Sequence, residues 1–341
     1  MTLSIIVPIY GVEKYLRPCL DSIAAQQGVE FEVLTVDDGG CDGCPAIIDE
    51  YASKDSRFVA IHKSNAGYGA AVNTGLERAR GDWIGIVEPD DWIEPDMYRT
   101  LLARADSSTD IVKANFRYIH PWGIVRKGIN CIPPSGRTFT ISEFPELLTV
   151  HPSIWTCLYR RRFLEEKRIR MKEIPGAGWA DNPFLHETMC QARGIAFVDR
   201  PVYNYRAPFE DPIIAKSDWR IPHDRLMEIC AWLRARKISD VGVWDGVYQR
   251  LLYCCGMMAL MRRDRVNVCA ALQELIRQVD PSKLNASGIL GRSTVMKYRL
   301  FRHHPLLAVP VVRLYLELKK AKMFLQLPFE KRRLRRNADE N

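Results

Sequence analysis

The sequence has no long apolar run and no recognisable secretion signal among its 341 residues. A membrane-spanning helix needs about 20 consecutive apolar residues, and no stretch supplies them, so we expect no spanning helix. The opening MTLSIIVPIYGVEKYL lacks the basic segment and long apolar core of a signal peptide. The ten cysteines are scattered, and Cys230, Cys255 and Cys269 fall in apolar runs, which is typical of reduced core residues. We therefore expect a protein of the reducing cytoplasm.

Several ligand-binding signatures are also missing. Cys41 and Cys44 form a CxxC motif, but no second pair at the right spacing accompanies it, so we do not expect structural zinc. The absence of a Walker A sequence excludes a P-loop protein. GYGAAV lacks the third glycine of a dinucleotide fingerprint, because Val72 stands in its place. No nucleic-acid motif appears, so we expect no nucleic-acid partner.

The first 120 residues do contain a regular alternation of short apolar strands with helical stretches. The strands are LSIIVPIY, FEVLTV, RFVAIHK and DWIGIV. This alternation predicts an α/β fold with a mostly parallel central sheet and helices on both faces. From about residue 218 the patterns are mainly helical. We expect a domain over residues 1–215, with halves 1–120 and 121–215, followed by a helical region over 216–341.

Acidic residues gather where two of these strands end. Asp37 and Asp38 follow the second strand, and Glu88, Asp90 and Asp91 follow the fourth. Carboxylates at this spacing repel one another, and their pKa values rise unless a positive charge lies between them. A solvated turn and a bound cation both account for one such cluster. Ligands bind at the carboxyl ends of parallel strands, so two clusters on that edge favour a site for a cation and a phosphate.

Three stretches follow one another along the chain: SIIVPIYGVEKYLRPCLDSI, VLTVDDGGCDG and KSNAGYGAAVNTGLERARGDWIGIVEPDDW. In this order they resemble the inverting glycosyltransferases of family 2, which have the GT-A fold. The resemblance covers residues 2–206. It implies an enzyme that moves a hexosyl or N-acetylhexosaminyl group from a nucleoside-diphosphate sugar, expected to be a UDP-sugar, to a hydroxyl acceptor. The expected acceptor is a growing cell-surface polysaccharide or a lipid-linked glycan. An inactive nucleotide-sugar-binding or scaffold protein on the same fold is the alternative.

The resemblance also implies donor-side roles. Glu88 and Asp90 fall on the family's Asp-x-Asp motif, whose carboxylates hold Mn²⁺ or Mg²⁺ against the diphosphate. Asp38 resembles the residue that accepts a hydrogen bond from uracil. Val72 departs from the family pattern, because many relatives have an arginine there that could contact a phosphate. The other candidates for donor binding are Pro8, Tyr10, Asn65, Gly67 and Asn73, and Asp90 belongs with them.

The acceptor side needs a group that takes a proton from the attacking hydroxyl. PGAGWADNPFLHE resembles the family segment that supplies this base, and Asp181 falls at its position. Asp181 also precedes a helical pattern, so a helix N-cap is the structural alternative. The further candidates for acceptor contact are Asp91, His151, Trp155, Tyr205 and Arg206. For Trp155, a place in the core is the alternative.

Basic residues concentrate near the C-terminus. The last long segment mixes apolar residues with many Lys and Arg: FRHHPLLAVPVVRLYLELKKAKMFLQLPFEKRRLRR. Such a segment can lie in the headgroup layer of anionic lipid. An amphipathic helix packed on the protein, with a solvated basic tail, accounts for the same pattern. The first alternative predicts peripheral contact with an anionic membrane, at the inner face of the plasma membrane.

Overall fold

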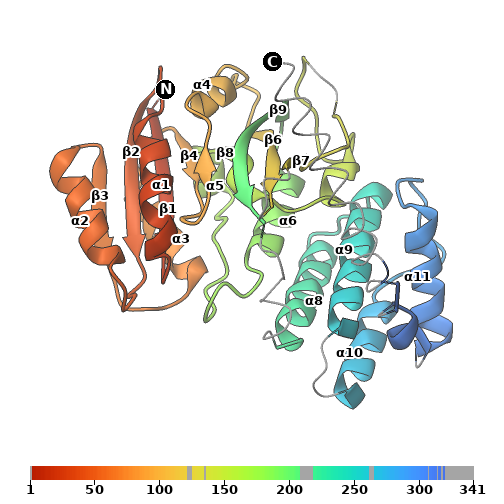
Figure 1. Cartoon of the computed structure of the whole chain (residues 1–341). Coiled ribbons are helices and arrows are strands. Elements are labelled where there is room, and N and C mark those ends of the chain that lie inside the picture. The colour runs from red at the N-terminus through yellow and green to blue at the C-terminus, as the bar shows by residue number, and fades with distance from the viewer. Residues whose placement is uncertain are drawn as a thin grey trace, which may run out of the picture. The chain divides into compact units, whose positions relative to one another are not determined.

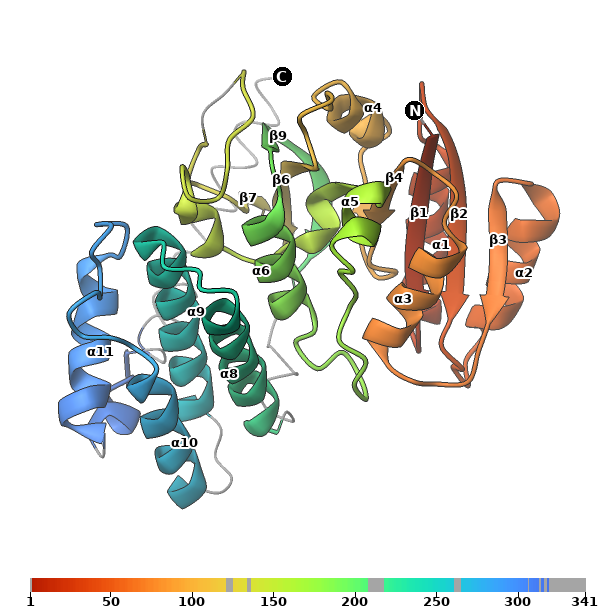
Figure 2. The same cartoon turned by 180° about the vertical axis from the view of Figure 1, so that it is seen from behind.

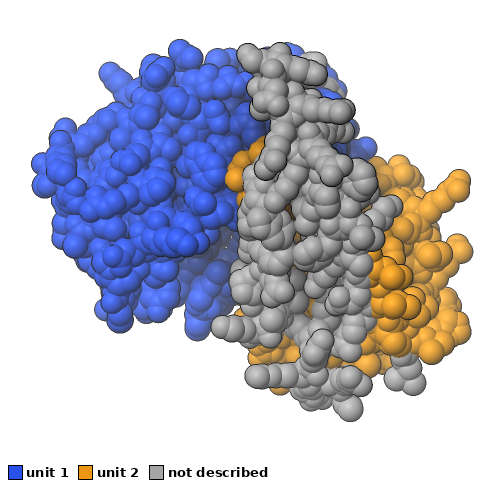
Figure 3. Space-filling view, in the orientation of Figure 1, with its two compact units in different colours: residues 1–118, 127–206 blue, residues 119–126, 207–341 orange. Residues whose placement is uncertain are grey.

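The chain folds into two compact units, described here from a computed structural model (Figures 1 and 3). The described residues are 2–120, 125–133, 136–207, 218–260, 265–305, 307–312, 314, 315 and 318. Unit 1 consists of Met1–Tyr118 and Lys127–Arg206, and unit 2 of Ile119–Arg126 and Ala207–Asn341. The predicted boundary between residues 215 and 216 lies outside the described residues.

The first four strands form a parallel sheet whose carboxyl ends lie at one edge. β1 (Thr2–Ile9), β2 (Glu30–Asp37), β3 (Phe58–His62) and β4 (Trp83–Ile86) are arranged in the order β3-β2-β1-β4 (Figure 1). The ends of β1, β2 and β3 are aligned, because Ile9 lies opposite Asp37 and Asp37 lies opposite His62, whereas β4 ends opposite Ile6. The residues that follow these strands therefore emerge side by side, as the alternation in the sequence predicts.

The rest of the sheet is largely antiparallel. β8 (Cys157–Arg160) pairs antiparallel with β4 and β6 (Ile111–Ile119), and β9 (Ile195–Arg206) pairs antiparallel with β5 (Trp92–Ile93). The order continues as β4-β8-β6-β9-β5. β7 (Val125–Lys127) is a short strand after β6. The sheet is therefore mixed, and the predicted parallel arrangement holds for its first four strands. The two residues of β5 are too few to give a periodic signal.

Helices cover both faces of the parallel part. α1 (Glu13–Ala24) and α2 (Cys44–Lys54) contact each other on one face, and α3 (Tyr68–Arg78) packs on β1 and β2 from the other (Figures 1 and 2). α1 buries one stripe with helical spacing, which consists of Leu16, Cys19, Leu20 and Ile23. The remaining helical elements of this unit are α4 (Met97–Leu102), the 3₁₀ turns η1 (Pro145–Leu148) and η2 (Ile154–Thr156), α5 (Arg161–Glu166) and α6 (Asp181–Gln191).

From residue 219 onward, the described part of unit 2 is mainly helical. Its helices are α8 (Arg220–Ala235), α9 (Val241–Leu260), α10 (Arg265–Arg277) and α11 (Arg292–His303), which confirms the predicted helical extension. The buried Asp245 carboxylate in α9 accepts backbone hydrogen bonds from Asn285 and Ser287, so the stretch between α10 and α11 is an ordered turn. Within the described residues, no helix is both long enough and apolar enough to cross a membrane.

The start of α3 packs backbone against backbone on residues 172–176. A Cβ on Gly69 would come within 2.0 Å of the carbonyl oxygen of Lys172, and a Cβ on Gly67 within 2.1 Å of that of Ile174. Gly67 also has a φ of +95°, which strongly favours glycine. This close approach fixes the position, relative to α3, of the segment that leads into α6.

Replacing Gly69 by Ala tests this contact. The added Cβ meets a main-chain carbonyl oxygen that cannot rotate away, so we expect the unfolding midpoint to fall by roughly 5–10 °C, as at an overpacked core site. Gly291→Ala is the matched control, because its Cβ would meet no atom within 4 Å and its φ of −64° suits any residue. Calorimetry of both variants measures the change. An unchanged midpoint for Gly69→Ala would contradict the packing.

Candidate active site

Three carboxyl groups lie in the turn that follows β4, called the acidic turn and formed by residues 88–91. Burial, with smaller contributions from the charges of Asp90, Asp91 and Asp181, raises the pKa of Glu88 to about 8. Burial and then the charge of Asp90 raise the pKa of Asp91 to about 8. Burial raises the pKa of Asp90 as well. Negative charge is therefore costly here, and a cation placed in the turn would relieve that cost.

Two tyrosine hydroxyls hold the acidic turn. The Tyr68 hydroxyl donates to Oε1 of Glu88 at 2.7 Å. The Tyr203 hydroxyl donates to Oδ2 of Asp91 at 2.9 Å and accepts the backbone N–H of Glu88 at 3.1 Å. The sequence did not predict either tyrosine. Side chains alternate along a strand, so Tyr203 lies on the same face of β9 as the predicted residue Tyr205. This alternation was the sequence signal that could have identified Tyr203.

Arg206 supplies positive charge beside the acidic turn. Its Nε donates to the carbonyl oxygen of Asp90 at 2.9 Å, and its guanidinium lies 4.7 Å from the ring centroid of Tyr15 and 4.9 Å from that of Trp92. Its backbone N–H donates to Oδ1 of Asp91 at 2.7 Å. Asp91 is only 1% exposed and both its oxygens accept hydrogen bonds from β9, so it fixes the turn and does not face an acceptor, contrary to the prediction.

Asp38 organises the loop between β3 and α3. Its carboxylate is buried and accepts three hydrogen bonds, from Lys63 Nζ at 2.6 Å, from the N–H of Ala66 at 3.0 Å and from the N–H of Gly67 at 2.8 Å. These bonds use three of the four acceptor positions of a carboxylate. The predicted donor residue Asn65 lies exposed in this loop, so Asp38 and the loop are built as one unit at the sheet edge.

Asn73 does not face the predicted donor site. Its Nδ2 donates to the carbonyl oxygen of Met171 at 2.9 Å and to Oε1 of Glu173 at 2.8 Å, and its Oδ1 accepts the N–H of Met171 at 2.9 Å. The residue is buried. The predicted donor contact is therefore wrong for this side chain, because its amide is already used to tie α3 to the segment that leads into α6.

Asp181 is the first residue of α6. The helix N-cap is Ala180, so the capping alternative for Asp181 does not hold. A carboxylate in the first helical turn is stabilised by the helix dipole, and Asp181 Oδ1 also accepts the side-chain amide of Asn182 at 3.0 Å. Burial raises the pKa values of Tyr68 and Glu88, and the charge of Asp181 contributes to both. Asp181 therefore lies close enough to the acidic turn for its charge to act on Glu88.

Aromatic residues cluster near the end of β9. Trp155 is 4% exposed and stacks on two rings, with centroid distances of 4.1 Å to Tyr203 and 5.2 Å to Tyr205, so the core alternative holds for its side chain. His151 and Tyr118 lie 5.6 Å from Tyr205, centroid to centroid. Tyr118, His151 and Tyr205 remain partly exposed, and these three rings are called the aromatic surface.

A fully buried lysine holds the segment 151–156. Nζ of Lys113 donates to the carbonyl oxygens of Pro152 at 3.1 Å and Ser153 at 3.0 Å, and to the hydroxyls of Ser153 at 2.8 Å and Thr156 at 3.1 Å. Burial lowers the pKa of this amine. Ser153 has a φ of +36°, an uncommon value for a residue with a side chain, and the lysine stabilises that conformation. Lys113 thereby positions part of the aromatic surface.

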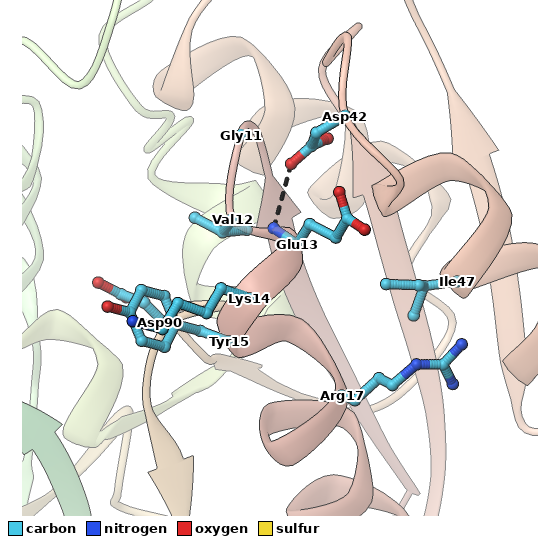
Figure 4. Close-up of a pocket in the computed structure, with 9 residues that line it drawn as sticks. All are labelled: Gly11, Val12, Glu13, Lys14, Tyr15, Arg17, Asp42, Ile47 and Asp90. Carbon is cyan, nitrogen blue, oxygen red and sulfur yellow. Dashed lines mark hydrogen bonds between the residues drawn. The ribbon is translucent and has the colours of Figure 1, made fainter.

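A pocket of about 540 Å³ opens beside Asp90 (Figure 4). Its lining residues are Gly11, Val12, Glu13, Lys14, Tyr15, Arg17, Asp42, Ile47 and Asp90. The N–H of Glu13 donates to Asp42 at 3.1 Å, which joins the start of α1 to the loop before α2 (Figure 4). Of the two candidates at the end of β1, Pro8 is buried and Tyr10 is 59% exposed, so only the Tyr10 ring is available to a ligand.

The acidic turn fits a divalent cation that is shared with a diphosphate. Within the described residues, no group of three or more His, Cys, Asp or Glu side chains could hold a metal ion by itself. Mg²⁺ at phosphate sites is typically held by one or two carboxylates together with substrate phosphates. Glu88 and Asp90 supply hard oxygen ligands with raised pKa values, although Tyr68 already occupies one oxygen of Glu88.

Comparison with known proteins shows which family the N-terminal part of the chain resembles. Residues 4–167 match the model of the family described as glycosyl transferase family 2. The matched segment is just under half of the chain. The chain is 34% identical to the putative glycosyltransferase EpsH of Bacillus subtilis (strain 168) over 211 residues, which cover 60% of this chain and 60% of EpsH. The match therefore spans less than two thirds of that relative.

Solved structures share the fold. The structure of S. aureus TarS 1-349 in complex with UDP-GlcNAc has a TM-score of 0.69 at 20% identity, and the match covers 94% of this chain and 92% of that one. The mannosyltransferase PcManGT from Pyrobaculum calidifontis, solved with GDP-Man and Mn²⁺, has a TM-score of 0.52 at 17% identity, with 92% and 87% covered. The predicted GT-A fold with a helical C-terminal extension is thereby confirmed.

Tyr68→Phe tests the hold on the acidic turn. Without the hydroxyl, a buried carboxyl loses its hydrogen bond, which typically costs about 1.5–3 kcal/mol. We therefore expect a divalent cation to bind roughly 10- to 100-fold more weakly. Tyr98→Phe is the matched control, because that buried hydroxyl has no hydrogen-bond partner among the described residues. Equal cation titration curves for Tyr68→Phe and wild type would contradict this role.

A histidine joins the ends of β2 and β3 to α2. His62 Nδ1 lies 3.0 Å from Asp37 Oδ2, and Nε2 lies 3.1 Å from Asp49 Oδ1. The interaction with Asp37, and then that with Asp49, raises the pKa of His62. An imidazole that faces two carboxylates donates to both only when it is protonated.

This geometry predicts a pH-dependent contribution to stability. Because the pKa is raised on folding, the stabilisation is full below the ordinary histidine pKa of about 6.5 and is lost as pH rises through the folded value. The side chain is 44% exposed, so we expect only roughly 1–2 °C of difference in unfolding midpoint between wild type and His62→Gln at pH 6, shrinking by pH 8.5. Thermal unfolding across this range measures the difference. A difference independent of pH would refute the assignment.

Proposed function

We propose that the chain is an inverting glycosyltransferase that moves a hexosyl or N-acetylhexosaminyl group from a nucleoside-diphosphate sugar to a hydroxyl acceptor. The observation that carries this proposal is the juxtaposition of the buried acidic turn with Asp181. One carboxylate pair suits a cation and a diphosphate, and a separate carboxylate on a helix start suits a proton acceptor. The family match supports the same reaction class.

The proposed donor is a UDP-sugar. Asp38 and the loop at residues 63–67 frame the base side, and the exposed Tyr10 ring can stack on the base. TarS was solved with UDP-GlcNAc, whereas PcManGT was solved with GDP-Man, so the fold accommodates both nucleotides. The choice of UDP rests on the resemblance of Asp38 to the residue that binds uracil. A screen of nucleotide sugars identifies the sugar that the site binds.

The proposed cofactor is Mn²⁺ or Mg²⁺ at Asp90, with Glu88 beside it. When bound, such a cation neutralises the diphosphate and stabilises the departing nucleoside diphosphate. Tyr68 orients the Glu88 carboxyl, and Tyr203 and Arg206 hold the backbone of the turn. The guanidinium of Arg206 adds fixed positive charge on the same side.

Asp181 is the proposed base. As the acceptor oxygen bonds to the anomeric carbon, the bond from that carbon to the diphosphate oxygen breaks, and the configuration inverts. The hydroxyl proton passes to a carboxylate oxygen of Asp181, and the nucleoside diphosphate leaves. Asn73 and the close contacts of Gly67 and Gly69 position the segment that carries this base. Their contribution to the reaction is to position Asp181.

The proposed acceptor is a growing surface polysaccharide or a lipid-linked glycan. Tyr118, His151 and Tyr205 offer partly exposed rings, and sugar rings stack on aromatic faces through their apolar C–H groups. Lys113 holds the segment that carries His151. We place the enzyme in the cytoplasm, with peripheral contact at the inner face of the plasma membrane, because a lipid-linked acceptor resides there.

A panel of nucleotide sugars tests the reaction. With wild-type protein and Mn²⁺, we expect one UDP-sugar to raise the unfolding midpoint and to be hydrolysed slowly, with both effects lost on chelation. Asp181→Asn should retain donor binding while transfer falls about 10²- to 10⁴-fold, as expected when a general base is removed. Asp90→Asn should lose the dependence on cation, and Asp82→Asn, an exposed carboxylate remote from the acidic turn, is the control.

The inactive-scaffold alternative makes a different prediction in the same assay. A scaffold binds a nucleotide sugar without releasing nucleoside diphosphate, and its cellular role is unaffected by Asp181→Asn. Binding of no nucleotide, with or without cation, would overturn both the transferase and the binding-protein interpretations.

A further inference from the structure

The helical segment after α11 packs on unit 2 through one face. Residues 307–312, 314, 315 and 318 are helical. Ala308 is fully buried and Val312 is 3% exposed. Cγ1 of Val312 lies 3.8 Å from where a Cβ on Gly256 of α9 would be. This face therefore completes the core of the helical unit.

The neighbouring face of the same segment is apolar as well, although it is exposed. Its large exposed residues form the outer apolar row, which consists of Leu307, Val311, Leu314, Tyr315 and Leu318. Each side chain is 47–62% exposed, and the spacing of 4, 3, 1 and 3 residues puts all five on one side of a helix. The solvent side of a packed helix is normally polar, and contiguous exposed apolar residues mark an interaction surface.

The part of the sequence that contains this row is strongly basic. From position 292 to 341 the sequence has 13 Lys and Arg and 4 Asp and Glu, a formal charge of +9, against +8 for the whole chain. The preceding 291 residues therefore carry 36 basic and 37 acidic residues, a formal charge of −1. The Lys297 ammonium of α11 lies 5.4 Å from the ring centroid of Tyr315, so a cation borders the row directly.

Apolar residues bordered by basic ones match the interface of an anionic bilayer. Apolar side chains partition into the acyl boundary while Lys and Arg attract anionic headgroups. Two copies that met through this region would bring like charges together, which disfavours self-association. We propose that the outer apolar row, with the basic residues of α11, docks the protein on an anionic membrane surface without crossing it.

The biological purpose of this docking rests on the proposed function. Docking would hold a transferase beside its lipid-linked acceptor. The basic stretch at residues 319–341 lies outside the described residues. Its sequence alone adds 8 Lys and Arg against 3 Asp and Glu to the same end of the chain. The proposal therefore predicts binding that needs both the apolar row and negative lipid charge.

Flotation with vesicles tests the docking on the full chain. Wild type should float with vesicles of phosphatidylcholine and phosphatidylglycerol, should stay in solution with phosphatidylcholine alone, and should be partly released by 0.5 M salt. Leu314→Ser/Leu318→Ser should lower the bound fraction at least fivefold. The matched control is Ile132→Ser/Val241→Ser, which removes exposed apolar residues elsewhere and should bind as wild type does.

Two results would overturn the proposal. One is a negative flotation result: wild type stays in solution with anionic vesicles, or Leu314→Ser/Leu318→Ser floats as well as wild type does. The other is a lipid-free dimer, seen by analytical ultracentrifugation, that Leu314→Ser/Leu318→Ser dissociates, because the row would then be a protein interface. Hydrolysis of the donor without vesicles should be unchanged in these variants. Vesicle binding without any donor turnover would refute the transferase while leaving the docking intact.

Discussion

Burial of carboxyl groups at the end of β4 is the constraint around which unit 1 is arranged. Glu88 and Asp91 have pKa values near 8 in this environment, so the fold places acidic groups where they resist ionisation. That turn accepts side-chain hydrogen bonds from three residues, Tyr68, Tyr203 and Arg206. A site that is costly for bare negative charge is suited to a cation and a diphosphate that arrive together.

The same constraint separates residues that hold the site from residues that meet a ligand. Asp91 and Asn73 have their polar atoms turned toward protein partners, whereas Asp90 borders an open pocket and Asp181 stands at a helix start. Lys113 and Tyr203 have similar structural roles. The buried Lys113 ammonium fixes the segment that carries His151, and the buried Tyr203 hydroxyl fixes the acidic turn. The candidate ligand contacts thus lie next to residues whose polar atoms are held by the protein itself.

The sequence predicted the parallel strands, their helices and the acidic clusters, because all of these depend on local periodicity and on where strands end. It did not predict the antiparallel strands β8 and β9 as parts of the same sheet, since their pairing is set by contacts across the fold. The error at Asn73 has the same origin: its partners lie about 100 residues further along the chain, and no local pattern shows which way an amide points. Tyr68 was missed because its partner, Glu88, belongs to another element.

The Tyr203 hydroxyl bonds to the acidic turn across more than 110 residues of sequence. Contacts between such distant positions form late in folding, because the intervening chain must be ordered first. The burial that raises the pKa values of Glu88 and Asp91 is therefore incomplete until β9 has joined the sheet. A nascent chain that ends before Arg206 carries the family's acidic motif in its sequence but has no site.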